Sequence, residues 1–292
     1  MAYQNLSDSF VKDILNYLEC PTDAPTLRYL NRIIYAYIRK VPWESVSRIV
    51  KRHTTTATSD CPRWPAEFWR DAMRYGFGGT CFESSLAFYD LLTSLGYQGY
   101  LTVNDMDASR ACHAAIVIII HGQKYLVDIT IPVHCAVRFD PQSVTKRRTS
   151  FQNYTIRPLG QNKYVVERSH HPRSYAFTLI DVPLSLPDYR SILEKDYETE
   201  GFFLKSVVMT KVIDGKAWRF FSEHKPYKLE SFDRQGKTEI LLPPEILTQT
   251  LADKFGMPED KIMTAFLEIH NPIEPYQPVR MSRSINLQLS TQ

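Results

Sequence analysis

The first ninety or so residues carry apolar side chains at helical spacing. The spacing recurs from Phe10 to Leu18 and again from Leu27 to Ile34, which predicts two amphipathic helices. A polar, threonine-rich stretch from Lys51 to Pro62 interrupts the pattern and predicts a loop. A shorter helix is predicted around Phe68 to Met73. This part of the chain is therefore expected to be a helical bundle.

Beyond Gly96 the pattern changes to short segments rich in β-branched and aromatic residues, which is typical of strands. The segment 132–162 has few strand signals and a basic run at 146–148. It is predicted to be a solvated loop, with a phosphate contact as the alternative. A helix is predicted from Pro243 to a closing Gly256. Strands are predicted at Tyr97–Val103, His113–Ile120, Lys124–Ile129, Tyr164–Glu167, Ser174–Leu179, Phe203–Thr210 and Trp218–Phe221.

Composition places the 292-residue chain among ordinary globular proteins, with 43% apolar and 23% charged residues. A formal net charge of +3 is too small to imply a nucleic acid partner or binding to an anionic membrane. The longest apolar run, Ala114 to Ile120, is too short to span a bilayer. The first ten residues lack a basic start followed by an apolar stretch, so a cytoplasmic location is the default expectation.

Cysteine usage points away from a disulfide framework, because the number is odd and the chain is large. A metal site could be built only from the neighbours Cys112, His113, His134 and Cys135, and adjacent ligands are poor chelators. No metal is therefore predicted. The cysteines are Cys20, Cys61, Cys81, Cys112 and Cys135.

The stretch from Gly78 to Glu83 is the most informative in the sequence. Thr80 and Glu83 have the spacing of a capping box, which predicts a helix that begins at Cys81 and ends at Gly96. Free amides and the partial positive charge of a helix start favour a thiolate over a thiol. Cys81 is therefore a candidate nucleophile. The alternative is a small apolar residue buried behind a glycine turn.

A base for this cysteine is predicted on a neighbouring hairpin. His121-Gly122 suits a two-residue turn, which places Ala115 opposite Asp128. His113 then points to the same face as Asp128, as a diagonal neighbour roughly 7–8 Å away along the backbone. A three-residue turn would put the two side chains on opposite faces. The alternatives are a turn-capping role for Asp128 and a strand-edge role for His113.

Together these residues resemble the arylamine N-acetyltransferase family. That family has an Arg-Gly-Gly-x-Cys-Phe-Glu-x-Asn motif, then a histidine on a strand, then an aspartate closing a Tyr-x-Val-Asp-like strand. Gly78–Glu83 matches the core of the first motif, His113 the histidine, and Tyr125–Asp128 the second motif. Pro42-Trp43-Glu44 is similar to the family's Pro-Phe-Glu turn, and Leu251–Met257 to its Phe-Gly-Ile helix end.

The resemblance implies an α+β fold of the papain-like and transglutaminase-like kind. Three units are expected: a helical bundle at 1–96 carrying the cysteine, a β-barrel at 97–205 carrying the histidine and aspartate, and an α/β lid with a C-terminal tail at 206–292. It also implies ping-pong chemistry. Cys81 would take an acetyl group from acetyl-CoA and pass it to an arylamine, arylhydrazine or hydroxylamine nitrogen, with His113 as base and Asp128 holding the histidine.

Three departures from the family pattern bear on these expectations. Phe77 replaces the motif arginine and Ser85 the motif asparagine, which is expected to alter packing around the cysteine loop. After the aspartate, Ile129-Thr130-Ile131-Pro132 replaces a glycine-containing turn. The donor-contact residues expected from the resemblance are Ser109 and Thr130. The altered turn keeps two alternatives open: a transglutaminase-like, amide-forming or thioester-hydrolysing enzyme, and a non-catalytic binding protein.

Overall fold

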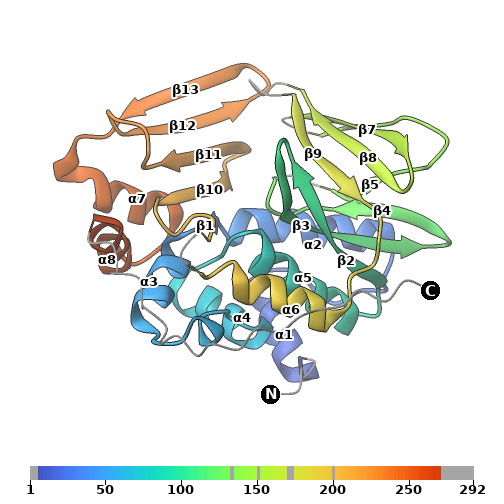
Figure 1. Ribbon diagram of the computed structural model, residues 1–292, viewed down its shortest axis with the longest axis horizontal. Helices are drawn as coiled ribbons and strands as arrows, with labels where there is room; N and C mark the ends of the chain where they lie inside the picture. Colours follow the sequence, from blue (N-terminus) through green and yellow to red (C-terminus); the bar gives the residue numbers. More distant parts are fainter. Residues whose placement is uncertain (1–5, 132–134, 150–151, 170–173, 199–200, 271–292) are drawn as a thin grey trace, which may run out of the picture.

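The computed structural model describes residues 6–131, 135–149, 152–169, 174–198 and 201–270. A layer of helices forms the base of the molecule in Figure 1. Ser7 and Thr26 cap the first two helices by accepting from backbone amides, as the sequence chemistry favours. The helices of this layer are α1 Asp8–Tyr17, α2 Leu27–Lys40, α3 Val46–Thr54, the short η1 Thr58–Asp60, α4 Pro65–Tyr75, α5 Cys81–Ser94 and, from later in the chain, α6 Leu186–Lys195.

An eight-stranded antiparallel sheet lies against this layer and curls until its edge strands β5 and β6 approach each other. Strand β3 is apolar on both faces because its alternate residues pack against the helices and into the barrel-like interior. In the sheet the strand order is β5-β4-β3-β2-β9-β8-β7-β6. The strands are β2 Gln98–Met106, β3 Ser109–Ile120, β4 Gln123–Val127, β5 Val137–Arg138, β6 Thr145–Arg148, β7 Asn153–Gly160, β8 Lys163–Arg168 and β9 Tyr175–Ile180.

A second antiparallel sheet and two helices complete the fold, and Figure 1 shows this α/β unit beside the barrel-like sheet. Its five strands have the order β1-β10-β11-β12-β13. Strand β1 comes from the helical part of the chain and so ties the two parts together. The elements are β1 Trp43–Glu44, β10 Val208–Ile213, β11 Lys216–Phe221, β12 Lys228–Asp233, β13 Gly236–Leu241, η2 Pro244–Ile246, α7 Leu247–Phe255 and α8 Glu259–His270.

The predicted α+β class with helices, a barrel-like sheet and an α/β lid is confirmed, whereas several local predictions are wrong. Helix α3 continues to Thr54, into the stretch predicted to be a loop. The segment 132–162 contains strands β5, β6 and β7, and the basic run lies on β6 because it pairs with β7. The proposed unit boundaries at 96 and 205 stay predictions. No helix among the described residues is long and apolar enough to cross a bilayer.

Candidate active site

The glycine loop before α5 is held tightly against the β1 segment. A Cβ atom on Gly78 would lie 1.6 Å from the carbonyl oxygen of Pro42, so only glycine fits there. The Gly78 amide donates to Glu44 Oε1 at 3.0 Å, and the Glu44 amide donates to the Gly79 carbonyl at 3.3 Å. These contacts fix the point where the chain turns into α5, which begins at Cys81 as predicted.

The predicted capping box is wrong. The Thr80 hydroxyl makes no cap hydrogen bond. The Glu83 carboxylate instead accepts from the backbone amide of Arg63 at 2.9 Å and from its Nη2 at 2.7 Å, and Tyr197 donates to it as well. Burial would raise the pKa of Glu83, but the Arg63 guanidinium outweighs burial and lowers that pKa. The buried Arg63 guanidinium needs a counter-charge, so it pairs with the Glu83 carboxylate that the predicted cap would have used.

The hairpin between β3 and β4 has the predicted register. Ile120 pairs with Gln123, and the turn residues His121 and Gly122 both have positive φ, as a two-residue turn requires. His113 and Asp128 therefore share a face of the sheet. Their side chains meet with 2.8 Å between Nε2 of the imidazole and Oδ2 of the carboxylate. The structure thus brings together the predicted base and orienter.

The second carboxylate oxygen of Asp128 is also occupied. Oδ1 accepts from the backbone amides of Thr130 and Ile131 at 2.9 and 3.1 Å, and from the Thr130 hydroxyl at 2.8 Å. Burial would raise the pKa of Asp128, but the charge of His113 and these hydrogen bonds lower it. Thr130, predicted as a donor contact, therefore also fixes the carboxylate.

His113 is enclosed on several sides. Its ring lies 4.5 Å from the Phe177 ring, measured between centroids, and its side chain interacts with that of Cys81, whose Sγ donates to the Cys112 carbonyl at 3.8 Å. Because Nε2 faces Asp128, the other ring nitrogen, Nδ1, is the one left for the thiol. Burial would lower the pKa of His113, but Asp128 and Cys81 outweigh burial and raise it. The imidazole is therefore a strong acceptor for a thiol proton.

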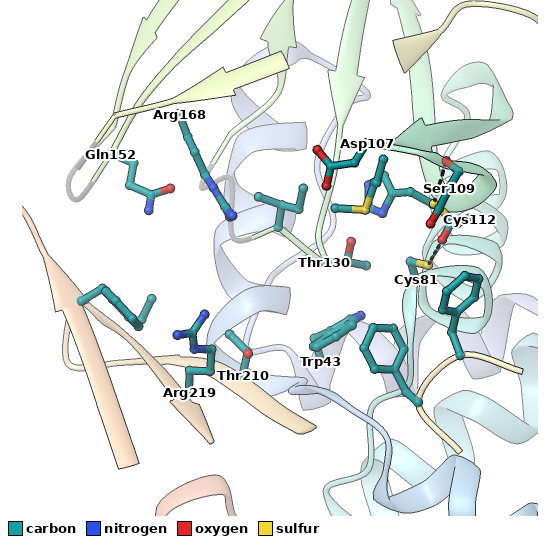
Figure 2. A pocket seen from close by; sticks show the side chains of 17 residues that line it. Trp43, Cys81, Asp107, Ser109, Cys112, Thr130, Gln152, Arg168, Thr210 and Arg219 are labelled. Atoms are coloured by element: carbon teal, nitrogen blue, oxygen red, sulfur yellow. Dashed lines mark hydrogen bonds between the residues drawn. The ribbon is translucent and has the colours of Figure 1, made fainter. Parts of the chain in front are cut away.

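A cavity of about 390 Å³ opens beside Cys81, where the helical layer, the barrel-like sheet and the α/β unit meet. Figure 2 shows Cys81 and Cys112 on one side of it and Arg168 and Arg219 on the other. Both predicted donor contacts, Ser109 and Thr130, line it. Apolar side chains provide much of its wall: Trp43, Met106, Ile131, Phe202, Phe203, Ala217 and Phe232.

The departures from the family motif have local explanations in part. Phe77 is buried against Tyr75 in the core of the α/β unit. Ser85 donates to the Ala114 carbonyl at 3.2 Å and so ties α5 to β3 beside His113. Pro132 and His134 lie outside the described residues. Cys135, another residue of the metal alternative, accepts from Arg147 Nε at 3.3 Å.

Several residues that shape the site, among them three arginines, were not predicted from the sequence. Arg63 lies beside the glycine loop, where its Nη2 donates to the Gly78 carbonyl at 2.6 Å, and it directly follows the stretch predicted to be a loop. Arg168 and Arg219 line the cavity from β8 and β11. Sheet curvature and long-range packing bring these two arginines to the cavity, so no local sequence pattern predicts their positions. Trp43 was visible only as part of the Pro42-Trp43-Glu44 turn.

The three-part fold, with a cysteine at the start of a buried helix facing a histidine on the barrel-like sheet, defines the fold class of the N-acetyltransferases. A profile of the N-acetyltransferase family matches residues 26–261. The chain belongs to this family, and the resemblance to arylamine N-acetyltransferases seen in the sequence is confirmed. A search of curated proteins finds no significant match.

Solved structures of arylamine N-acetyltransferases share the fold. The Salmonella typhimurium enzyme has a TM-score of 0.73 at 14% identity, over 90% of this chain and 99% of that one. The Mycobacterium marinum enzyme in complex with CoA has a TM-score of 0.72 at 16% identity, over 87% and 97%. A Bacillus cereus enzyme described as having a unique Cys-His-Glu triad has a TM-score of 0.68 at 19% identity, over 86% and 99%.

Proposed function

We propose that this protein transfers an acetyl group from acetyl-CoA to the nitrogen of an arylamine or arylhydrazine, through a thioester on Cys81. The observation that carries the proposal is the cysteine at the start of α5, which lines one cavity with a histidine that Asp128 holds at 2.8 Å. The aromatic acceptor and the CoA donor are supported by the solved structures that share the fold, which are arylamine N-acetyltransferases, one of them in complex with CoA. The apolar, partly aromatic wall of the cavity suits such an acceptor.

In the first half-reaction, His113 takes the Cys81 proton and the thiolate attacks the carbonyl carbon of acetyl-CoA. A bond forms between Cys81 Sγ and the acetyl carbon, and the bond from that carbon to the CoA sulfur breaks. The imidazolium returns its proton to the departing CoA thiolate. Backbone amides at the start of α5, which no Thr80 side chain caps, are donors for the oxyanion that forms on the way.

In the second half-reaction, the amine nitrogen attacks the acetyl carbon of the thioester. The bond between carbon and Cys81 Sγ breaks, and His113 accepts the proton that the nitrogen loses. The proton then returns to the Cys81 sulfur, which restores the starting enzyme. Asp128 keeps the imidazole oriented through both steps and stabilises its protonated form. We place no metal in this reaction.

The decisive experiment mixes the protein with acetyl-CoA and measures the intact mass and the modified peptide. We expect one acetyl group on Cys81, and release of that group to aniline as acetanilide. Cys81→Ala should remove the modification. Cys112→Ala is the matched control, because Cys112 lines the same cavity from the neighbouring strand and should leave acetylation of Cys81 in place.

The outcomes separate the alternatives. Acetylation followed by loss to water, with no capture by aniline, would favour a thioester hydrolase. An unmodified Cys81 with acetyl-CoA and with longer acyl-CoA donors would refute the proposal and leave a binding protein or an enzyme with another donor.

A cytoplasmic location stays a prediction from the sequence.

A further inference from the structure

Arg168 stands at the end of β8 and lines the cavity that Cys81 also lines. Figure 2 shows its side chain reaching into the cavity on the side away from Cys81. Its Nε atom is buried, and no described residue accepts a hydrogen bond from it. No carboxylate of the described chain forms an ion pair with its guanidinium. The Arg168 side chain therefore offers an unpaired N–H donor at Nε and a permanent charge to whatever fills the cavity.

The other charged side chains in and beside the cavity have interactions of their own. Arg219 donates from Nε and Nη2 to the same oxygen of Glu230. Asp128 is held by His113 on one oxygen and by Thr130 on the other. Asp107 lies on the turn between β2 and β3 and has an interaction of its own. Arg168 is thus the cation of this cavity that the described residues leave without a counter-charge.

The surroundings of the Arg168 guanidinium disfavour its charge. Burial lowers the pKa of Arg168, and the nearby Arg219 lowers it further, although Tyr154 and Asp128 partly oppose the effect. A partly buried guanidinium without a partner is less stable than a matched one, so a negative charge beside it is favourable. An anionic group bound in the cavity would both match the charge and accept the hydrogen bonds that are now unmade.

Gln152 adds a second donor to the same cavity wall. It is buried, and its Oε1 accepts from the Tyr154 hydroxyl at 2.9 Å. That bond fixes the amide so that Nε2 is left as the donor, and no described residue accepts from it. Planar arrays of N–H donors around a guanidinium are the pattern that binds a carboxylate.

We propose that Arg168, with Gln152, binds a carboxylate of the substrate at the end of the cavity opposite Cys81. The inference rests on the proposed acyl transfer and narrows its substrate class. The substrate would react at Cys81 at one end, lie against the apolar wall in the middle, and carry an anionic group at the other end. That carboxylate could belong to the amine acceptor or to a dicarboxylic acyl group delivered by CoA.

The test compares charged and neutral members of matched pairs. For the acceptor, kcat/KM is measured for 4-aminobenzoate and 4-aminobenzamide with acetyl-CoA. For the donor, the rate of Cys81 acylation is measured with succinyl-CoA and acetyl-CoA without acceptor. In Arg168→Gln, we expect the acid-to-neutral ratio of one pair to fall by roughly 10- to 100-fold, the range for a hydrogen bond to a charged group. Arg168→Lys should recover part of that ratio.

A matched control is Arg157→Gln, because Arg157 lies on the neighbouring strand β7, is half exposed and pairs with Glu167 outside the cavity. It should leave both ratios as in the wild type. A change in the acceptor ratio assigns the carboxylate to the amine, and a change in the donor ratio assigns it to the acyl group. The inference is overturned when neither ratio responds to Arg168→Gln.

An equilibrium measurement makes the inference independent of turnover. Calorimetric titration with benzoate and benzamide, and with succinate and succinamide, reports charge recognition even where Cys81 is never acylated. Weaker binding of either acid to Arg168→Gln than to wild type supports the anion site. Equal binding of each acid by both proteins, or no binding of either, counts against it. Acylation of Cys81 without any charge preference would leave the proposed function standing and remove only this inference.

Discussion

At the scale of single residues, the site depends on how completely the imidazole of His113 is surrounded. Asp128 holds one ring nitrogen, Cys81 faces the other, and Phe177 packs on the ring. Asp128 is in turn fixed by three donors from Thr130 and Ile131. A carboxylate with this many donors cannot turn away from the histidine without leaving buried amides unpaired. The orientation of His113 is therefore set by a chain of specific contacts.

The first prediction concerns this orientation. Asp128→Asn can keep the acceptor oxygen that Thr130 and Ile131 use, but its amide would face the His113 nitrogen with a donor. We expect the rate of Cys81 acetylation to fall by roughly 10³- to 10⁴-fold, because the imidazole loses the correct tautomer and the support for its charge. Stopped acylation reactions analysed by mass spectrometry measure this rate.

Asp181→Asn is the control, since Asp181 is another buried carboxylate of the same sheet, bound to Lys124 and Tyr100 and not lining the cavity. It should leave the acetylation rate close to that of the wild type. Near wild-type acetylation in Asp128→Asn would contradict the role given to that residue.

The sequence predicted that Cys81, His113 and Asp128 come together, but its prediction for one neighbour, Glu83, was wrong. Cys81, His113 and Asp128 are separated by short, regular segments whose turn chemistry sets their positions. Glu83 had the spacing of a cap, yet spacing says nothing about a cation brought in by tertiary packing. The Arg63 guanidinium binds the Glu83 carboxylate instead. Its position depends on how the chain between η1 and α4 packs against the glycine loop.

At the scale of elements, the start of α5 is secured by a buried ion pair. Arg63 and Glu83 are each almost fully buried, with 2.7 Å between Nη2 and Oε2. The same guanidinium donates to the carbonyl of Gly78. The position of the cysteine therefore depends on a charge pair that links the glycine loop to the first turn of the helix.

The second prediction follows from this pair. Arg63→Met should destabilise the protein by about 3–5 kcal/mol, because the Glu83 carboxylate stays buried without its cation. Arg63→Met combined with Glu83→Gln should recover part of that loss, since the neutral amide no longer needs a counter-charge. Urea unfolding of the wild type, both single variants and the double variant gives the coupling energy. Additive single effects would contradict a direct pairing.

The elements that were predicted correctly have recognisable local sequence patterns. The β3–β4 hairpin has a long apolar strand and a two-residue turn, and α7 ends at a glycine with positive φ. Strand β13, at the edge of the second sheet, was missed because it is exposed along its whole length and shows no apolar alternation. Strand β6 was missed because three of its four residues are basic. Such edge strands form because a neighbouring strand offers backbone partners, which a local pattern does not reveal.

At the scale of the whole molecule, stability depends on groups whose pKa changes on folding, and two of them act in opposite directions. His113 has a raised pKa in the folded protein, so its contribution is fully present below about pH 6.5 and is lost as pH rises through the folded-state value. Burial lowers the pKa of Lys211 to about 8, so stability is gained as pH rises from there toward about 10.4.

The third prediction separates these effects. The difference in free energy of unfolding between the wild type and Asp128→Asn should shrink as pH rises from about 6.5 into the alkaline range, because the variant lacks the carboxylate that raises the pKa of His113 most. Denaturant titrations at a series of pH values measure it, with Lys211→Met in both backgrounds to remove the opposing slope. A difference that does not change with pH would contradict the ion pair.

The cavity is built by segments far apart in the chain, from Trp43 on β1 to Phe232 on β12. In the proposed reaction, proton transfer at Cys81 involves α5 and the β3–β4 hairpin, whereas the opposite wall of the cavity comes from the end of β8 and from the α/β unit. This separation has an evolutionary consequence. Substitutions on the far wall can retune which amines or acyl groups are accepted while the reacting centre stays intact. Substrate range in such a scaffold can diverge quickly, and overall identity is then a poor guide to it.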